Sequence, residues 1–84
     1  MAYSVRLDKR VEKDLAVLPS EARARIGRKI GQLEQDPFPK GVIELHGEDS
    51  YRIRIGDYRV VHDVDASAQT VTVLRVAHRK DIYR

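Results

Sequence analysis

Three arginines flank a short turn signal in the second half of the chain, and their spacing could bind phosphate. The dipeptide Gly56-Asp57 has glycine first, which is the layout of a type II′ turn between two antiparallel strands. Because side chains alternate between the faces of a strand, Arg52, Arg54 and Arg59 then project from one face, with Arg54 opposite Arg59. Like charges in that position destabilise a sheet, whereas guanidinium groups bind phosphate through paired hydrogen bonds. The pattern favours a phosphate-binding surface.

A second interpretation of these arginines is the solvated face of an amphipathic hairpin, with the charge relieved by Asp63 or Asp49. Edge strands often carry charge for solubility. The chain has 11 Arg against 5 Lys, and six of the Arg follow residue 50. This excess suits phosphate, because only Arg presents a planar fork of donors, but it is also what a biased genome composition produces. Both interpretations stay open at this point.

Aromatic and imidazole side chains near the arginines supply further candidate contacts. Tyr51 and Tyr58 adjoin the arginines and could stack on RNA bases, although tyrosines at the edge of a core are the more frequent arrangement. Tyr83, in the polar tail, is better placed for a nucleotide. His78 follows the last expected strand beside Arg79, at an expected exposed position where an imidazole could exchange protons near neutral pH.

The sequence shows no pattern of a metal or cofactor site. The three His have neither HxxxH nor HExxH spacing, and His62 lies in an expected strand, where a half-buried and hydrogen-bonded role is usual. The chain has no Cys, which excludes disulfides, thiolate zinc sites and a cysteine nucleophile. We therefore expect no metal ion and no cofactor.

The elements that must position these residues follow from the apolar pattern. Alternation over residues 3–7 predicts a strand, and Val11, Leu15 and Leu18 share one face of a helix that Asp8 can cap. Pro19 ends this helix. A second helix then begins with the capping pair Ser20-Glu21, is buried along Ala22, Ile26, Ile30 and Leu33, and ends at residues 36–39.

The second helix also has a basic face opposite its apolar stripe. Arg25, Arg28 and Lys29 lie there at helical spacing. Such a face is usually only solvated, and contact with a nucleic-acid backbone is the functional alternative.

Beyond residue 41 the chain is rich in β-branched residues, which favour strands. Four strands are expected, at residues 42–45, 51–55, 58–64 and 70–76. The predicted fold is α+β in the order β-α-α-β-β-β-β: a strand, a helical hairpin and a mostly antiparallel sheet, with a short turn or helix over the tail 77–84.

Length and composition bound the protein class. A chain of 84 residues with 42% apolar and 35% charged residues is expected to form one soluble domain, over residues 1–84. No apolar run approaches the roughly 18 residues of a membrane span, and the first residues lack the layout of a signal peptide. We therefore expect a cytoplasmic protein without a membrane partner.

Two segments of the chain carry a family resemblance. They are residues 47–61, with the core Tyr-Arg-Ile-Arg, a turn and Tyr-Arg-Val, and residues 73–83. Both resemble the RelE/ParE superfamily of toxins from bacterial and archaeal toxin–antitoxin systems. The resemblance spans essentially the whole chain. It implies a RelE-like fold and the toxin of a type II system. In the RelE branch it implies an mRNA endoribonuclease that works on the ribosome. The ParE branch, which poisons DNA gyrase without nuclease activity, is the alternative.

The RelE resemblance implies metal-free cleavage, in which a ribose 2′-OH attacks its own 3′ phosphate and leaves a 2′,3′-cyclic phosphate and a 5′-OH. The basic family positions before the tight turn match Arg52 and Arg54. The family arginine after the turn, which stabilises the phosphate, matches Arg59. Arg79 matches the acid or leaving-group stabiliser, and Tyr83 matches the tyrosine that stacks on the nucleotide.

The chain departs from the best-known RelE pattern, which has Lys at the positions of Arg52 and Arg54. An arginine stays protonated and is a poor general base. Activation could instead be mainly electrostatic on the ribosome, or nuclease activity could be weak or lost. The remaining candidates for the base are Glu48, Asp49, His78 and Tyr83.

The resemblance also implies the partners. A toxin of this kind is made with a small antitoxin that wraps it and covers the basic face, and it acts on the ribosome and its mRNA. A basic surface attracts an acidic amphipathic partner, and folding of that partner on binding suits reversible inhibition.

Overall fold

The chain folds into one sheet with a two-helix layer, in a computed structural model that describes residues 2–45 and 50–80. The predicted order of one strand, two helices and four strands is confirmed. The elements are β1 (Ser4–Leu7), α1 (Lys9–Ala16), α2 (Ser20–Gln32), β2 (Ile43–Glu44), β3 (Ser50–Ile55), β4 (Tyr58–Asp65) and β5 (Thr70–His78).

The two helices begin differently. The predicted cap of α1 is confirmed, because an Asp8 carboxylate oxygen accepts a hydrogen bond of 3.0 Å from the backbone N–H of Arg10. The capping role expected for Ser20 is wrong: Pro19 occupies the N-cap of α2, Ser20 is the first helical residue, and no side chain caps this end. Proline fixes φ near the value that precedes a helix, so α2 begins without that bond.

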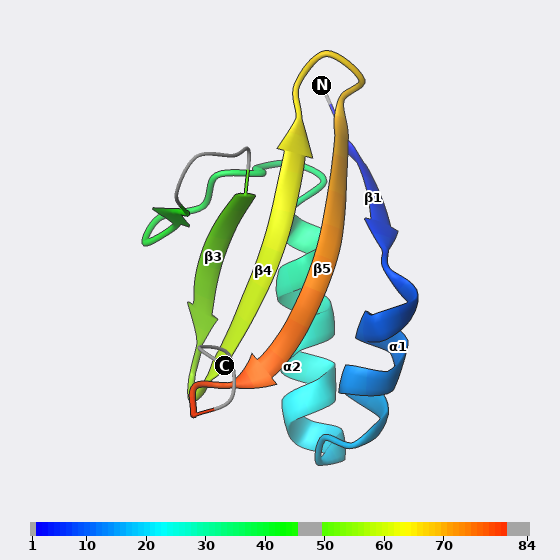
Figure 1. Ribbon diagram of the computed structural model, residues 1–84, viewed down its shortest axis with the longest axis vertical. Coiled ribbons are helices and arrows are strands. Elements are labelled where there is room, and N and C mark those ends of the chain that lie inside the picture. Colours follow the sequence, from blue (N-terminus) through cyan, green and yellow to red (C-terminus); the bar gives the residue numbers. More distant parts are fainter. Residues whose placement is uncertain (1, 46–49, 81–84) are drawn as a thin grey trace.

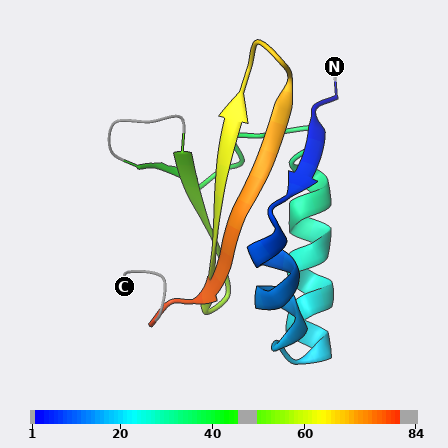
Figure 2. The same ribbon diagram turned by 45° about the vertical axis from the view of Figure 1, so that its right-hand side comes forward.

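The sheet has the strand order β1-β5-β4-β3-β2. β1 pairs in parallel with β5, and the remaining pairs are antiparallel, so the sheet is mixed. Both helices lie on one face of the sheet, and among the described residues the other face carries no helix (Figures 1 and 2). We call this second face the open face.

The apolar core lies between the sheet and the helices, as the alternating pattern predicts. From α2 and its C-cap it receives Ile26, Ile30 and Leu33, the stripe expected from the sequence, while Ala22 is half-buried. The core side chains of the other elements are Val11, Ile53, Ile55, Val60, Val64, Val71, Val73 and Val76.

A bulge interrupts the pairing of β4 with β5. Val61 pairs with Arg75 and His62 pairs with Val73, so Leu74 is an extra residue on β5. Before the bulge Val73 points into the core, and after it Val76 does. The bulge therefore shifts the alternation of β5 by one residue.

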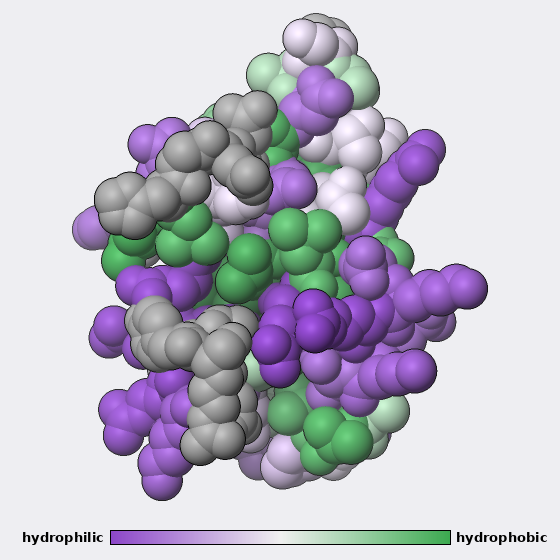
Figure 3. Space-filling view, in the orientation of Figure 1, coloured by the Kyte–Doolittle hydropathy of each residue, from purple (hydrophilic) through white to green (hydrophobic). Residues whose placement is uncertain are grey.

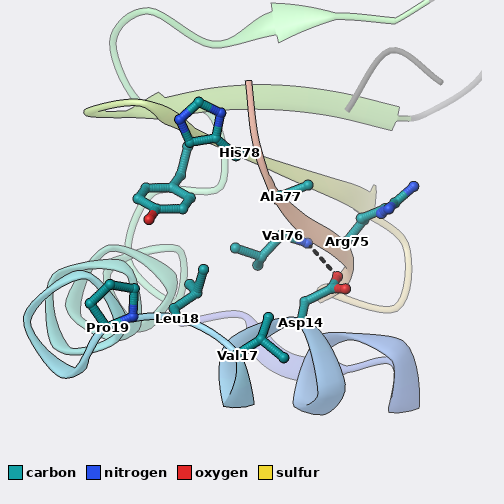
Figure 4. Close-up of a pocket in the computed structure, with 9 residues that line it drawn as sticks. Asp14, Val17, Leu18, Pro19, Arg75, Val76, Ala77 and His78 are labelled. Carbon is teal, nitrogen blue, oxygen red and sulfur yellow. Dashed lines mark hydrogen bonds between the residues drawn. The ribbon is translucent and has the colours of Figure 1, made fainter. Parts of the chain in front are cut away.

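The C-terminal half of β5 lies beyond the end of β1, whose pairing stops at Val73. There the backbone N–H of Val76 donates to a carboxylate oxygen of Asp14 in α1, at 2.8 Å. A groove of about 470 Å³ opens beside this contact, between the end of α1, the α1–α2 connection and β5 (Figure 4). Leu18 and Pro19 lie on its helix side.

The tail differs in part from the prediction. β5 extends to His78, so the expected final turn is shorter, with Arg79 and Lys80 forming a turn. The last four residues of the predicted turn or helix lie outside the described residues. None of the helices in the described part of the chain is long and apolar enough to cross a membrane.

Candidate functional site

The turn between β3 and β4 sets the register that the sequence predicts. Gly56 has φ of +60°, while Gln69 alone among the described non-glycine residues has a positive φ, so Asp57 does not. These signs are those of a type II′ turn. Ile55 pairs with Tyr58 as expected.

Arg52, Arg54 and Arg59 share the open face. Arg54 pairs with Arg59, and Arg52 pairs with Val61 in the next row. The intervening Ile53 points toward the helices and is buried. The predicted placement of the three arginines on one face is confirmed, and we call these three residues the arginine cluster. Hydrophilic side chains gather over the half of this face that lies toward the hairpin turn (Figure 3).

Arg59 is the member of the cluster with the least contact with water, at 6% exposed. Its Nη1 lies 3.5 Å from the carbonyl oxygen of Tyr58, and its buried Nε has no hydrogen-bond partner among the described residues. An unpaired buried donor costs about 1–3 kcal/mol, and a charged one more. A fully solvated hairpin face would not hold an arginine in this state, whereas a bound anion would satisfy it.

The other two arginines border open space. Arg52 is half-buried and Arg54 is exposed. Together with Gly41 and Ile43 they line a hollow of about 260 Å³ beside β2. Asp63, proposed from the sequence as a relieving charge, lies on the same face, but its carboxylate accepts a hydrogen bond from the Ser50 hydroxyl.

Arg79 lies next to the hairpin turn. Its backbone N–H donates to the carbonyl oxygen of Asp57 at 2.8 Å, and the residue is exposed. This bond ties the end of β5 to the turn that carries Arg54 and Arg59. The other tail candidate, Tyr83, lies outside the described residues, as do Glu48 and Asp49.

The structure separates His78 and Tyr51 from the arginine cluster. The expected exposed position of His78 is wrong, since it is the last residue of β5, half-buried, with its ring edge-on to Tyr58 at 5.6 Å. Tyr51 packs edge-on against Phe38 at 5.0 Å. Both side chains lie on the helix side of the sheet, because Tyr51 and Tyr58 pack against the core there. The core-edge interpretation of these tyrosines is confirmed.

Two basic residues of α2, Arg25 and Lys29, lie near the β3–β4 hairpin rather than on the open face. The Arg25 guanidinium packs against Gly56, where a Cβ atom would be 2.5 Å from Nη2. Lys29 and Arg54 line a hollow of about 100 Å³ between α2 and β3. Arg28 is exposed.

His62 is fully buried, deeper than the half-buried position expected from the sequence. Its Nε2–H donates to the carbonyl oxygen of Pro37 at 2.9 Å, so the expected hydrogen-bonded role is confirmed. Burial lowers its pKa below the usual value of 6.5, while the Pro37 bond and the Asp63 charge act in the opposite direction. The imidazole is therefore a neutral core group that joins β4 to the segment after α2.

Arg75 joins the open face although the sequence did not indicate it. Strict alternation from Val71 and Val73 would turn Arg75 into the core, but the bulge places it opposite Val61. The break in the alternation, with apolar Val76 following Val73 after three positions, was the only signal. In Figure 4 its side chain points away from Val76 and Leu18.

Comparison with known proteins agrees with this geometry. Residues 5–83 match the family model described as the ParE toxin of the type II toxin-antitoxin system parDE. Toxin RelG of Mycobacterium tuberculosis is 36% identical over 88 aligned positions, which cover 100% of this chain and 99% of RelG.

Solved structures agree as well. The toxin–antitoxin complex RelBE2 from Mycobacterium tuberculosis has a chain with a TM-score of 0.83 and 30% identity, covering 94% of this chain and 100% of that one. The archaeal RelE–RelB complex from Pyrococcus horikoshii OT3 gives a TM-score of 0.82 and 32% identity, with 96% and 99% covered. By full-length sequence and by fold, the chain belongs to the RelE/ParE family and is a RelE-like toxin of a type II toxin–antitoxin system.

Proposed function

We propose that this toxin is a ribosome-dependent mRNA endoribonuclease, which cleaves by attack of a ribose 2′-OH on the adjacent phosphate. The observation that carries the proposal is the arginine cluster on the open face, in which the buried Nε of Arg59 has no partner within the described ranges. The attack concentrates negative charge on the phosphate oxygens, and fixed cations stabilise such charge in the transition state.

Each basic residue has a proposed role. Arg52 and Arg54 border the open hollow and bind the message, and Arg59 stabilises the charge on the attacked phosphate. Arg79, held beside the turn by its bond to Asp57, stabilises or protonates the leaving oxygen. Tyr83 stacks on the nucleotide. The helix residues Arg25, Arg28 and Lys29 contact the RNA backbone beyond the hairpin.

The general base is not an arginine, because arginine stays protonated. His78 is a poor candidate, since its imidazole packs on Tyr58 on the helix side of the sheet. Glu48, Asp49 and Tyr83 remain the candidates. Without one of them, positioning of the 2′-OH on the ribosome and the charge of the arginine cluster account for activation.

The proposed partner is a small antitoxin that covers the open face. The related toxins from Mycobacterium tuberculosis and Pyrococcus horikoshii were crystallised in RelBE and RelE–RelB complexes. The open face, which carries no helix among the described residues, and the positive charges of the arginine cluster suit an acidic segment that folds as it binds.

The proposal is tested by inducing the chain in cells without an antitoxin and mapping message ends by primer extension. We expect new 5′ ends within translated regions and arrested growth, both absent with Arg59→Ala. Purified chain should cut a message on ribosomes and leave free message intact. Intact messages in arrested cells would overturn the nuclease proposal.

A second candidate function is a gyrase poison, favoured by the match of residues 5–83 to the ParE toxin model. It is distinguished by a supercoiling assay with purified DNA gyrase. Inhibition of supercoiling with undisturbed translation would establish this branch. We expect the reverse result.

A further inference from the structure

The bulge in β5 changes which side chains can act together on the open face. With Leu74 as the extra residue, Arg75 faces Val61, and Arg59 faces Ala77 two residues further on. Arg59 and Arg75 are therefore diagonal neighbours on adjacent strands, a spacing of about 7–8 Å that long side chains bridge easily. A regular strand would have placed Arg75 in the core.

The state of the Arg75 guanidinium parallels that of Arg59. Arg75 is half-buried, and its Nε is buried without a hydrogen-bond partner among the described residues. Asp14 of α1 lies beside the same stretch of β5, but its carboxylate accepts from the Val76 N–H at the strand edge (Figure 4). Within the described part of the chain, the unpartnered buried side-chain donors of arginine are thus those of Arg59 and Arg75.

We propose that Arg75 is a further phosphate-binding residue of the toxin, which contacts the RNA backbone next to the phosphate held by Arg59. Two orphaned donors on neighbouring strands and on the same face are satisfied together by one anionic backbone. The proposed function identifies this ligand as single-stranded RNA. The bulge therefore adds a side chain from β5 to a site that is otherwise formed by β3 and β4.

The test is equilibrium binding of a fluorescein-labelled single-stranded RNA of about twelve nucleotides, a length within the usual site sizes, by anisotropy over a series of salt concentrations. Arg75→Ala should weaken binding about ten- to a hundredfold, as for a lost charge-assisted hydrogen bond. It should also flatten the plot of log affinity against log salt by about 0.7. A role in folding alone would not change that slope.

Three further variants make the result specific. Arg75→Lys should restore the slope but only part of the affinity, because lysine lacks the planar fork. The double variant Leu74→Arg, Arg75→Leu keeps the net charge but moves the guanidinium, and it should bind as weakly as Arg75→Ala. Arg10→Ala removes an exposed charge on α1 and should bind like the wild type.

The outcomes separate this inference from the proposed function. Arg75→Ala or the double variant binding with the wild-type affinity and slope would overturn the inference, as would no RNA binding by the wild type. Cleavage on ribosomes is measured in parallel. A wild type that binds RNA and never cleaves would overturn the nuclease proposal and leave Arg75 as an RNA contact.

Discussion

Arg54 and Arg59 face each other across β3 and β4, a pairing that the sheet alone does not favour. Arg59 adds a buried donor without a described partner. Natural proteins keep such unfavourable arrangements mainly where function uses them. At the scale of single residues, the site is therefore recognised by an unfavourable pairing of like charges and by the buried Nε of Arg59.

The first prediction concerns the removal of a charge that is proposed to stabilise the transition state. Arg59→Ala and Arg79→Ala should each lower the rate of message cleavage on ribosomes about 10²–10³-fold. The measurement is single-turnover cleavage, with circular dichroism to show that each variant is folded. Arg23→Ala, an exposed charge on α2, is the matched control and should cleave normally. Normal cleavage by both site variants would contradict the proposed roles.

His62 gives a prediction of pH dependence. Its pKa is lowered by burial, so the unfolded chain takes up a proton at higher pH than the folded chain. The free energy of unfolding is therefore highest above the usual value of 6.5 and falls as the pH drops from there toward the lowered pKa. A protonated ring would also bury an unpaired Nδ1–H.

The measurement for His62 is urea unfolding at about pH 7.5 and about pH 5.5, on either side of the histidine titration. His62→Gln can keep a donor for the Pro37 carbonyl and does not titrate in this range. It should be less stable than the wild type at the higher pH and should lose less stability on acidification. An equal loss in the two proteins would show that other groups dominate.

At the scale of elements, α2 contains two glycines that its surroundings do not require. A Cβ atom at Gly27 or Gly31 would meet nothing within 4 Å. Gly27→Ala and Gly31→Ala should therefore each raise the free energy of unfolding by about 0.5–1 kcal/mol, measured by urea denaturation. Gly56→Ala is the contrast, because φ is +60° and Arg25 must move, and it should destabilise by about 1–2 kcal/mol or more.

The elements also show how far the sequence could predict the site. The β3–β4 hairpin was predictable in register, because a two-residue loop with Gly56 fixes which residues pair. The bulge was not, since Leu74 is apolar and fits either phase of a strand. The position of His78 was predicted wrongly because the β-branched residues end at Val76, whereas β5 continues to His78. The partner of His62 is Pro37, 25 residues away, and no local pattern reports such a contact.

At the scale of the whole molecule, both helices pack on one side of a five-stranded sheet. The core was predictable from the apolar stripes for this reason. On the open face the arginine cluster was predictable from the hairpin register, whereas Arg75 was not, because its position depends on the bulge. The net charge of +3 is small. Four arginines nevertheless lie on the open face, where the proposed antitoxin or RNA would meet them: Arg52, Arg54, Arg59 and Arg75.

The Asp14–Val76 bond has a consequence for how copies of the chain meet one another. It occupies an N–H on the β1 side of β5, at a stretch where no described strand pairs with that edge, and it sets a negative charge beside the edge. Unpaired edges template pairing between chains, and an inward-facing charge blocks it.

Asp14→Ala should therefore make the toxin self-associate through β5, with a larger apparent mass in sedimentation velocity as concentration rises. Asp14→Asn keeps an acceptor for Val76 and should stay closer to the wild type. If Asp14→Ala and Asp14→Asn have the same apparent mass at every concentration, the carboxylate serves only to anchor α1. If they differ as expected, the bond that holds α1 against β5 also prevents pairing between copies of the free toxin.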